Sequence, residues 1–125
     1  MKVVVALCAL ATLGTASPHP DDPFVGRIKV RTAACIGRFD QANMRIIDER
    51  TIVYFAAARR LWRNDLPDRC PGLDRDPLLV VEQFGSQLCE HDRIRLIERG
   101  SHIPGPYCRL GRFSAWDKPP TGRTD

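Results

Sequence analysis

The stretch from residue 43 to residue 57 reads NMRIIDERTIVYFAA, and it decides the fold class. Two runs rich in β-branched and aromatic or aliphatic residues, 43–47 and 51–57, flank a polar triplet. Such residues fit the pleated, half-buried surface of a sheet, and a short polar break between two such runs is typical of a hairpin. The sequence therefore predicts a β-hairpin that turns at Asp48, Glu49 and Arg50.

The same pattern continues towards the C-terminus. We expect further strands at 60–63, 78–84, 93–98 and 107–113, separated by turn-forming residues such as the triplet Pro104-Gly105-Pro106. The run at 78–84 is the most apolar and β-branched of these, so we place it at the centre of a sheet. The fold class predicted is an all-β or β-rich small single domain of antiparallel meanders and hairpins.

One segment also fits a helix. Tyr54, Ala57 and Leu61 fall at helical spacing, and the alanines at 56–58 favour a helix. The β-branched and aromatic cluster that begins at Thr51 favours a strand instead. We prefer the strand, and a helix over 53–64 is the alternative.

Residues 1–16 have the layout of a signal peptide. Lys2 supplies a positive charge, residues 3–13 form an apolar run, and small residues precede a cleavage position after Ala16. The apolar run is shorter than the roughly 20 residues that a transmembrane helix needs. We therefore expect a protein exported to the periplasm or secreted, with no transmembrane segment in the mature chain.

The domain plan follows from this cleavage position. Residues 17–34 begin with prolines and aspartates and are expected to form an extended leader, residues 35–116 to form the β-rich domain, and residues 117–125 to form a flexible polar tail. A mature chain of this length suits one core.

Cysteine usage agrees with export. The chain has five cysteines, and Cys8 leaves with the signal peptide, which leaves Cys35, Cys70, Cys89 and Cys108. An even number in an oxidising compartment predicts two disulfides with three possible connectivities. We favour the nested one, Cys35 with Cys108 and Cys70 with Cys89. The paired Cys and His spacings of structural zinc are missing, so we expect no metal and no cofactor.

Charge is modest and strongly biased in type. The chain carries 19 basic and 15 acidic residues, and lysine occurs only at 2, 29 and 118. The positive charge is spread along the chain, so we do not expect nucleic-acid binding, and a genome rich in G and C would also produce the excess of arginine. If the arginines share a face, they would suit an anionic envelope lipid, a polysaccharide carboxylate or an acidic partner protein. The candidate binding residues are Arg59, Arg60, Arg63, Arg93 and Arg95.

No residue is assigned a catalytic role. His91 lies between Glu90 and Asp92, but neighbours in sequence point to different sides of a strand or turn, so their adjacency does not make a site. His19 and His102 lie in proline-containing segments without a nucleophile at a recognisable spacing, and no serine has the Gly-x-Ser-x-Gly surroundings of a hydrolase. A non-catalytic binding or envelope-associated module is the preferred function. A small secreted enzyme with a histidine-centred site and a purely structural accessory protein are the alternatives.

A series of motifs runs along the chain: Cys35-Ile36, Ile46-Ile47-Asp48 to Tyr54, Leu61-Trp62-Arg63-Asn64-Asp65-Leu66, Cys70-Pro71-Gly72-Leu73, Leu88-Cys89 with Asp92 and Ile94, and Cys108 to Phe113. The order of these motifs resembles an uncharacterised family of small exported bacterial proteins, the domain-of-unknown-function family 6491. The resemblance implies a signal peptide or lipoprotein anchor, a compact β-rich domain and paired cysteines, and it implies no activity. The chain departs from anchored members because Cys8 has no usable lipobox.

Overall fold

The computed structural model describes residue 14, residues 21–57 and residues 59–120. Nearly all of the segment assigned to a signal peptide lies outside this part of the chain. The described residues form antiparallel β-strands and short 3-10 helices, and none of their helices is long and apolar enough to cross a membrane. The prediction of a small β-rich domain is confirmed.

The strands form three antiparallel sheets. In spatial order, the five-stranded sheet consists of β1 (Ile28–Ala33), β10 (Phe113–Asp117), β5 (Arg60–Asp65), β4 (Thr51–Phe55) and β3 (Met44–Asp48). The three-stranded sheet consists of β6 (Leu78–Glu82), β8 (Arg93–Ile97) and β9 (Pro104–Arg109). The remaining elements are β2 (Cys35–Ile36), which pairs with β7 (Leu88–Cys89), and the 3-10 helices η1 (Arg38–Gln41) and η2 (Leu73–Arg75).

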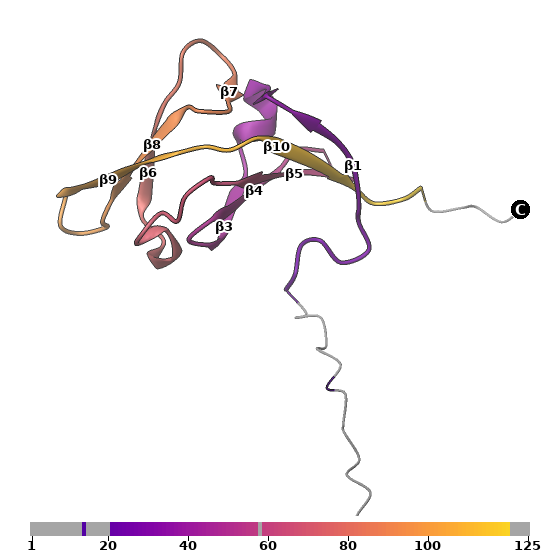
Figure 1. Cartoon of the computed structure of the whole chain (residues 1–125), viewed down its shortest axis with the longest axis horizontal. Coiled ribbons are helices and arrows are strands. Elements are labelled where there is room, and N and C mark those ends of the chain that lie inside the picture. The colour runs from indigo at the N-terminus through magenta and orange to yellow at the C-terminus, as the bar shows by residue number, and fades with distance from the viewer. Residues whose placement is uncertain (1–13, 15–20, 58, 121–125) are drawn as a thin grey trace, which may run out of the picture.

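Strands β9 and β10 join the two larger sheets. Figure 1 shows them as one long ribbon that passes from the three-stranded sheet into the five-stranded sheet. The chain bends between them at residues 110–112, where Asn64 hydrogen-bonds the backbone of Gly111. This continuous segment allows both sheets to contribute to one hydrophobic core.

The core lies on the inner faces of these sheets. Tyr54, Trp62 and Phe113 enter it from the five-stranded sheet, and Ile94 and Leu96 enter it from the three-stranded sheet. The rings of Tyr54 and Phe113 meet edge to face with centroids 5.9 Å apart. Burial raises the pKa of the Tyr54 hydroxyl, because its charged form would lose its hydration.

The outer face of the five-stranded sheet is also covered. Val53 and Leu61 are fully buried there, and they point away from the main core because side chains alternate along β4 and β5. Residues 21–27 lie across this face: the Phe24 ring packs edge to face on Trp116, with centroids 5.2 Å apart. The Arg27 side chain donates hydrogen bonds to the carbonyls of Pro23, Arg59 and Trp116. Residues 21–27 therefore form part of the folded domain.

Most of the predicted strands are confirmed. The hairpin is formed by β3 and β4, and the strands predicted at 60–63 and 93–98 are β5 and β8. The helix considered for 53–64 is wrong, because residues 51–55 pair with residues 61–65 in an uninterrupted antiparallel register.

Two strand predictions are wrong in part. The run at 78–84 does form a strand, β6, but β6 pairs with β8 alone and lies at the edge of its sheet, not at the centre. Its apolar composition reflects strand propensity, which carries no information on how many neighbours a strand has. The strand predicted at 107–113 divides between β9 and β10, because the chain bends at Gly111.

The sheets extend beyond residues 35–116 at both ends. Strand β1 lies within the segment assigned to a leader and pairs with β10 from Ile28 onwards. At the other end, Asp117 accepts two hydrogen bonds from Arg60. Within the described part of the leader segment, residues 21–27 form turns and residues 28–33 form β1, which is part of the sheet.

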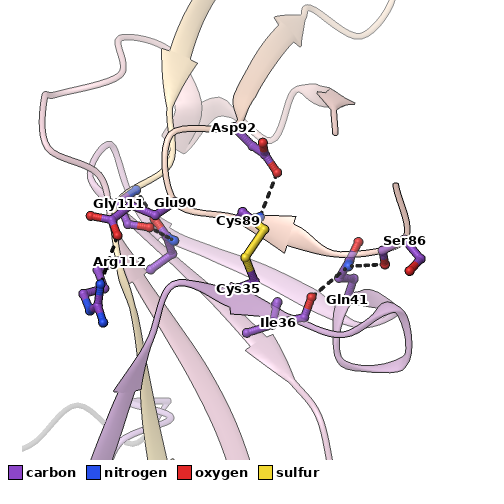
Figure 2. Close-up of a disulfide and its surroundings, with 10 residues drawn as sticks. Cys35, Ile36, Gln41, Ser86, Cys89, Glu90, Asp92, Gly111 and Arg112 are labelled. Carbon is purple, nitrogen blue, oxygen red and sulfur yellow. Dashed lines mark hydrogen bonds and ion pairs between the residues drawn. A yellow bond between two sulfur atoms is a disulfide. The ribbon is translucent and has the colours of Figure 1, made fainter. Parts of the chain in front are cut away.

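Two disulfides close the fold, and the nested connectivity is wrong. Cys35 bonds to Cys89, and Cys70 bonds to Cys108. Cys35 and Cys89 stand directly opposite each other in the β2–β7 pair, and Figure 2 shows the bond between them. Cys70 is buried below the three-stranded sheet, where Cys108 points inward from β9. The pairing follows strand register, which sequence separation does not reveal.

Candidate functional site

The first three predicted arginines do not form one surface. Side chains alternate along β5, so Arg60 and Arg63 project from opposite faces of the five-stranded sheet. Arg59 precedes the strand, and its guanidinium donates a hydrogen bond to the carbonyl of Lys118. The condition that these arginines share a face is not met.

Arg60 and Arg63 are used within the fold. Arg60 forms an ion pair with Asp117 at 2.7 Å and donates two hydrogen bonds to its carboxylate. These hydrogen bonds lower the pKa of Asp117 and raise the pKa of Arg60. Arg63 pairs with Asp65 at 2.8 Å and stacks on the Phe24 ring at 4.9 Å. Both guanidinium groups have carboxylate partners and they project from opposite faces of the sheet, so they do not form a common anion site.

Glu49 and Arg69 form a further ion pair, at the turn of the first hairpin. The hydrogen bond from Arg69 lowers the pKa of Glu49, and a second hydrogen bond from the Gly72 amide acts in the same direction. The Glu49 carbonyl also accepts a hydrogen bond from the Cys70 amide. This contact holds the segment that leads into η2 and is structural.

The other two predicted arginines do come together. Arg93 and Arg95 project from the outer face of β8, and Tyr107 of β9 stands opposite Arg95. The guanidinium carbons of Arg93 and Arg95 lie 4.9 and 4.7 Å from the centre of the Tyr107 ring. Arg95 also donates a hydrogen bond to the Tyr107 hydroxyl at 3.1 Å. We call Arg93, Arg95, Tyr107 and Arg109 the arginine–tyrosine cluster.

Arg109 completes this cluster because it stands directly opposite Arg93 in the β8–β9 register. Like charges at opposed positions of an antiparallel pair repel each other. Among the described residues one carboxylate, that of Glu82, pairs with the cluster, and it lies 2.7 Å from Arg93. Among the described residues, the Nε atom of Arg95 is the only buried side-chain polar atom without a hydrogen-bond partner. The cluster therefore holds more positive charge and donor capacity than the protein itself satisfies.

Tyr107 and Arg109 were not among the predicted site residues. Their signal was present, since positions 107 and 109 share one face of a strand whose neighbour carries arginines at 93 and 95. The missing knowledge was that these two strands are neighbours. Guanidinium groups suit carboxylate and phosphate oxygens, so the chemistry that this surface offers is anion recognition.

Of the histidines, His91 lines a shallow hollow together with Glu82, Asp92 and two members of the cluster, Arg93 and Arg109. His91 occupies a tight turn with a φ of 74°, its side chain is 76% exposed, and its Nε2 lies 4.0 Å from Glu90. The carboxylate of Asp92 accepts a hydrogen bond from the Cys89 amide at 2.7 Å, as Figure 2 shows. Glu90 pairs instead with Arg112 at 3.3 Å. The segment 89–92 therefore forms a turn that supports the disulfide.

His102 lies in the exposed loop between β8 and β9, close to a small cavity of about 230 Å³. This cavity does not include either histidine in its lining, and proline and aliphatic side chains make up most of its wall. Within residues 21–57 and 59–120, no group of three His, Cys, Asp or Glu side chains is placed to hold a metal ion.

Comparisons of the chain with protein-family models, curated proteins and solved structures found no match. The resemblance to domain-of-unknown-function family 6491 stays a prediction. The function is therefore argued from the geometry of the arginine–tyrosine cluster.

Proposed function

We propose that this chain is an exported, non-catalytic binding module that recognises an anionic partner through the arginine–tyrosine cluster. One observation carries the proposal: Arg93 and Arg95 stack on Tyr107, Arg109 stands opposite Arg93 on the same sheet face, and among the described residues Glu82 is the one carboxylate that forms an ion pair with these three arginines. Repulsion between Arg93 and Arg109 is relieved when an anion lies between them.

The cluster is suited to binding because it is held in place. Its members belong to paired strands, and the Tyr107 ring, which is 44% exposed, stacks with two guanidinium groups. Stacking on an aromatic ring limits the freedom of an arginine, so less entropy is lost when its fork meets an oxyanion. The partner proposed is an anionic component of the cell envelope or an acidic protein that presents carboxylate or phosphate groups.

Export is part of the same proposal. The layout of residues 1–16 is typical of a signal peptide, and disulfides such as Cys35–Cys89 and Cys70–Cys108 persist in oxidising compartments. The mature protein is expected to have the mass of residues 17–125 less four hydrogens. A purified protein that retains residues 1–16 would contradict export.

Binding is tested with fluorescently labelled polyglutamate as the anionic probe, with polygalacturonate and phosphatidylglycerol vesicles as further probes. The double variant Arg95→Gln/Arg109→Gln removes two of the three charges and leaves the Arg93–Glu82 pair in place. We expect affinity for the preferred probe to fall by about tenfold for each arginine, because hydrogen bonds to charged groups contribute about 1.5 kcal/mol or more each. Affinity should also fall as salt is raised.

The matched control is Arg38→Gln/Arg50→Gln, which removes the same charge from two exposed arginines outside the three-stranded sheet. The control should bind within about twofold of the wild type, as expected for screened charges far from the ligand. Equal losses in both double variants would show that net charge, not the cluster, attracts the probe. Failure of the wild type to bind any of the three probes would overturn the proposal.

A further inference from the structure

The outer face of the three-stranded sheet carries apolar side chains beside the arginine–tyrosine cluster. Leu79 and Ile94 point towards the core, so the residues next to them along β6 and β8 point outward. On this outer face Leu78 and Val80 are 43% and 45% exposed, so the face is open to solvent. The five-stranded sheet differs, because residues 21–27 lie across its outer face.

The register of the three strands fixes how apolar and charged groups are arranged on the outer face. From one end of the face to the other, the three rows of opposed residues are Leu78 with Ile97, Val80 with Arg95 and Tyr107, and Glu82 with Arg93 and Arg109. The first row is apolar, the second combines an apolar side chain with a guanidinium and an aromatic ring, and the third is charged. The outer face is therefore amphipathic along the direction of its strands.

Positive charge is in excess at the charged end. Glu82 forms an ion pair with Arg93 at 2.7 Å, and Asp92 lines the shallow hollow that Arg93 and Arg109 also line. These two carboxylates stand against the three arginines of the cluster. The Asp92 carboxylate is also engaged by the Cys89 amide, from which it accepts a hydrogen bond. An anion that approaches this end meets a net positive surface.

An exposed aromatic ring lies next to this charge. Phe84 follows β6, its side chain is 94% exposed, and it lines the same hollow as Arg93 and Arg109. Folding removes almost none of this ring from water, so the hydrophobic effect favours its transfer to another apolar phase. Apolar groups thus lie on both sides of the cluster, with Leu78 and Val80 towards one end and Phe84 at the other.

We propose that this face binds the surface of a phospholipid membrane that contains anionic lipids. The inference rests on the proposed anion binding by the arginine–tyrosine cluster and names the source of the anion. Lipid phosphates suit the guanidinium groups, and the adjoining acyl-chain region accepts Leu78, Val80 and Phe84. A soluble carboxylate polymer offers the charge alone, and it would leave these three side chains in water.

The size of the face favours a membrane over a protein partner. Three strands about 4.8 Å apart, with five residues at about 3.4 Å each, cover an area of roughly 250 Å². A specific protein interface buries about 800 Å² on each partner and needs close shape complementarity. Binding to a fluid bilayer depends instead on the apolar area that is buried and on attraction between charges.

Co-sedimentation with vesicles tests the inference. We expect the oxidised mature protein to bind vesicles made of equal parts phosphatidylglycerol and phosphatidylcholine, to bind less as salt is raised, and not to bind phosphatidylcholine alone. Leu78→Ala/Val80→Ala should weaken vesicle binding by about tenfold, because less apolar area is buried. The same variant should bind polyglutamate within about twofold of the wild type, because that probe uses charge alone.

Met44→Ala/Ile47→Ala is the matched control. These two apolar residues of β3 are 42% and 40% exposed, but they lie on the other sheet. The control should therefore bind the anionic vesicles within about twofold of the wild type, as expected for side chains that do not meet the lipid.

A tryptophan at position 84 provides a readout of insertion that does not depend on affinity. When anionic vesicles are added, the emission of Phe84→Trp should move to shorter wavelength and be quenched by brominated lipids, because indole rings partition into the membrane interface. Met44→Trp, which places the new ring on the five-stranded sheet, should show neither change.

The outcomes separate this inference from the proposed function. A wild type that binds polyglutamate but no anionic vesicles would overturn the membrane inference alone and favour an acidic polymer or protein as the partner. Vesicle binding that Leu78→Ala/Val80→Ala leaves unchanged, or an emission of bound Phe84→Trp that does not shift, would also overturn it alone, since charge would then be the only attraction. Vesicle binding that Arg95→Gln/Arg109→Gln leaves unchanged would overturn both, because the cluster would take no part.

Discussion

Asn64 makes two buried hydrogen bonds to the backbone of Gly111. Its side-chain amide donates to the Gly111 carbonyl at 2.8 Å and accepts from the Gly111 amide at 2.9 Å, and both partners are buried. Gly111 lies so close to the carbonyl of Asp65 that a Cβ at this position would overlap it. One side chain thus satisfies both backbone groups of the residue at which β9 bends into β10. A buried backbone group without a partner is costly, so this contact stabilises the bend.

Replacing Asn64 with alanine should therefore destabilise the protein. The change leaves the amide and the carbonyl of Gly111 without their buried partner, and we expect a loss of about 2 to 4 kcal/mol in the free energy of unfolding. Urea denaturation followed by tryptophan fluorescence measures this loss. Asn43→Ala, at an exposed position outside the strands, is the control and should change stability by less than about 0.5 kcal/mol. If the two variants proved equally stable, the bend would not depend on Asn64.

The role of Asn64 could not be predicted from its neighbours in sequence. Local rules alone would place Asn-Asp-Leu-Pro at 64–67 in a turn in which the Asn side chain bonds nearby backbone, but Asn64 bonds the backbone of Gly111 instead. The residue belongs to β5, and its partner lies 47 positions along the chain. Local rules describe local hydrogen bonds, and this one depends on the tertiary fold.

At the level of elements, the segment 21–27 acts as a cover for the outer face of the five-stranded sheet. Phe24 fits between Trp116, with ring centroids 5.2 Å apart, and the guanidinium of Arg63 at 4.9 Å. Arg45 adds a hydrogen bond to the carbonyl of Asp21 at 3.0 Å. A sheet face that would otherwise expose apolar residues to water is thereby shielded on the side opposite the main core.

We expect Phe24→Ala to loosen this cover without disrupting the main core. The loss of the aromatic contact and of part of its buried area should cost about 1 to 2 kcal/mol. Trp116 should become more accessible to acrylamide, whereas Trp62, which is buried in the core, should not. Phe39→Ala is the control because Phe39 is 91% exposed, and it should leave both stability and quenching unchanged. Unchanged quenching in Phe24→Ala would show that the segment does not cover the sheet.

The comparison of predicted and observed elements separates local from non-local information. Runs such as 51–55 and 93–97 have enough β-branched and apolar residues to be identified as strands from sequence. Strands β2 and β7 have two residues each and are defined by their pairing and their disulfide, so no pattern could indicate them. The position of β6 at an edge, and the bend that separates β9 from β10, also depend on neighbours that are distant in sequence.

The candidate site shows the same division. The sequence singled out Arg93 and Arg95 correctly as members of a common face, since alternate residues of one strand share a side. The sequence could not show that Arg60 and Arg63 project from opposite faces of the sheet. Each of them forms an ion pair with its own carboxylate, so the two do not make a cluster. Nor could the sequence add Arg109, which joins the site through the pairing of β8 with β9.

At the scale of the whole molecule, the two disulfides cross each other along the chain. The first joins residues 54 positions apart and links β2 to β7, and the second joins residues 38 positions apart and links the segment before η2 to β9. Each loop contains one cysteine of the other bond. Together they tie the small sheet and the three-stranded sheet to the rest of the chain, and they restrict the unfolded chain more than they change the folded one.

Removal of either disulfide should therefore lower stability by a similar amount. Closing loops of these lengths costs the unfolded chain entropy that corresponds to about 4 kcal/mol in each case, since the cost varies only slowly with loop length. We expect Cys35→Ala/Cys89→Ala and Cys70→Ala/Cys108→Ala to unfold at lower urea concentrations than the wild type. The second variant should lose somewhat more than the first, because Cys70 is fully buried and its replacement also removes packing in the core.

A tryptic digest without reduction checks that these are the bonds being removed. Each cysteine of the folded domain falls in a separate tryptic peptide: 32–38, 70–75, 76–93 and 100–109. The wild type should yield 32–38 joined to 76–93 and 70–75 joined to 100–109, and each double variant should retain one of these pairs. A joined pair of 70–75 with 76–93 would instead support the nested connectivity, and the loss of stability would then have to be assigned to loops of different length. Equal stability of wild type and both variants would show that the sheets hold together without the crossed bonds, because a core of this size would then be sufficient alone.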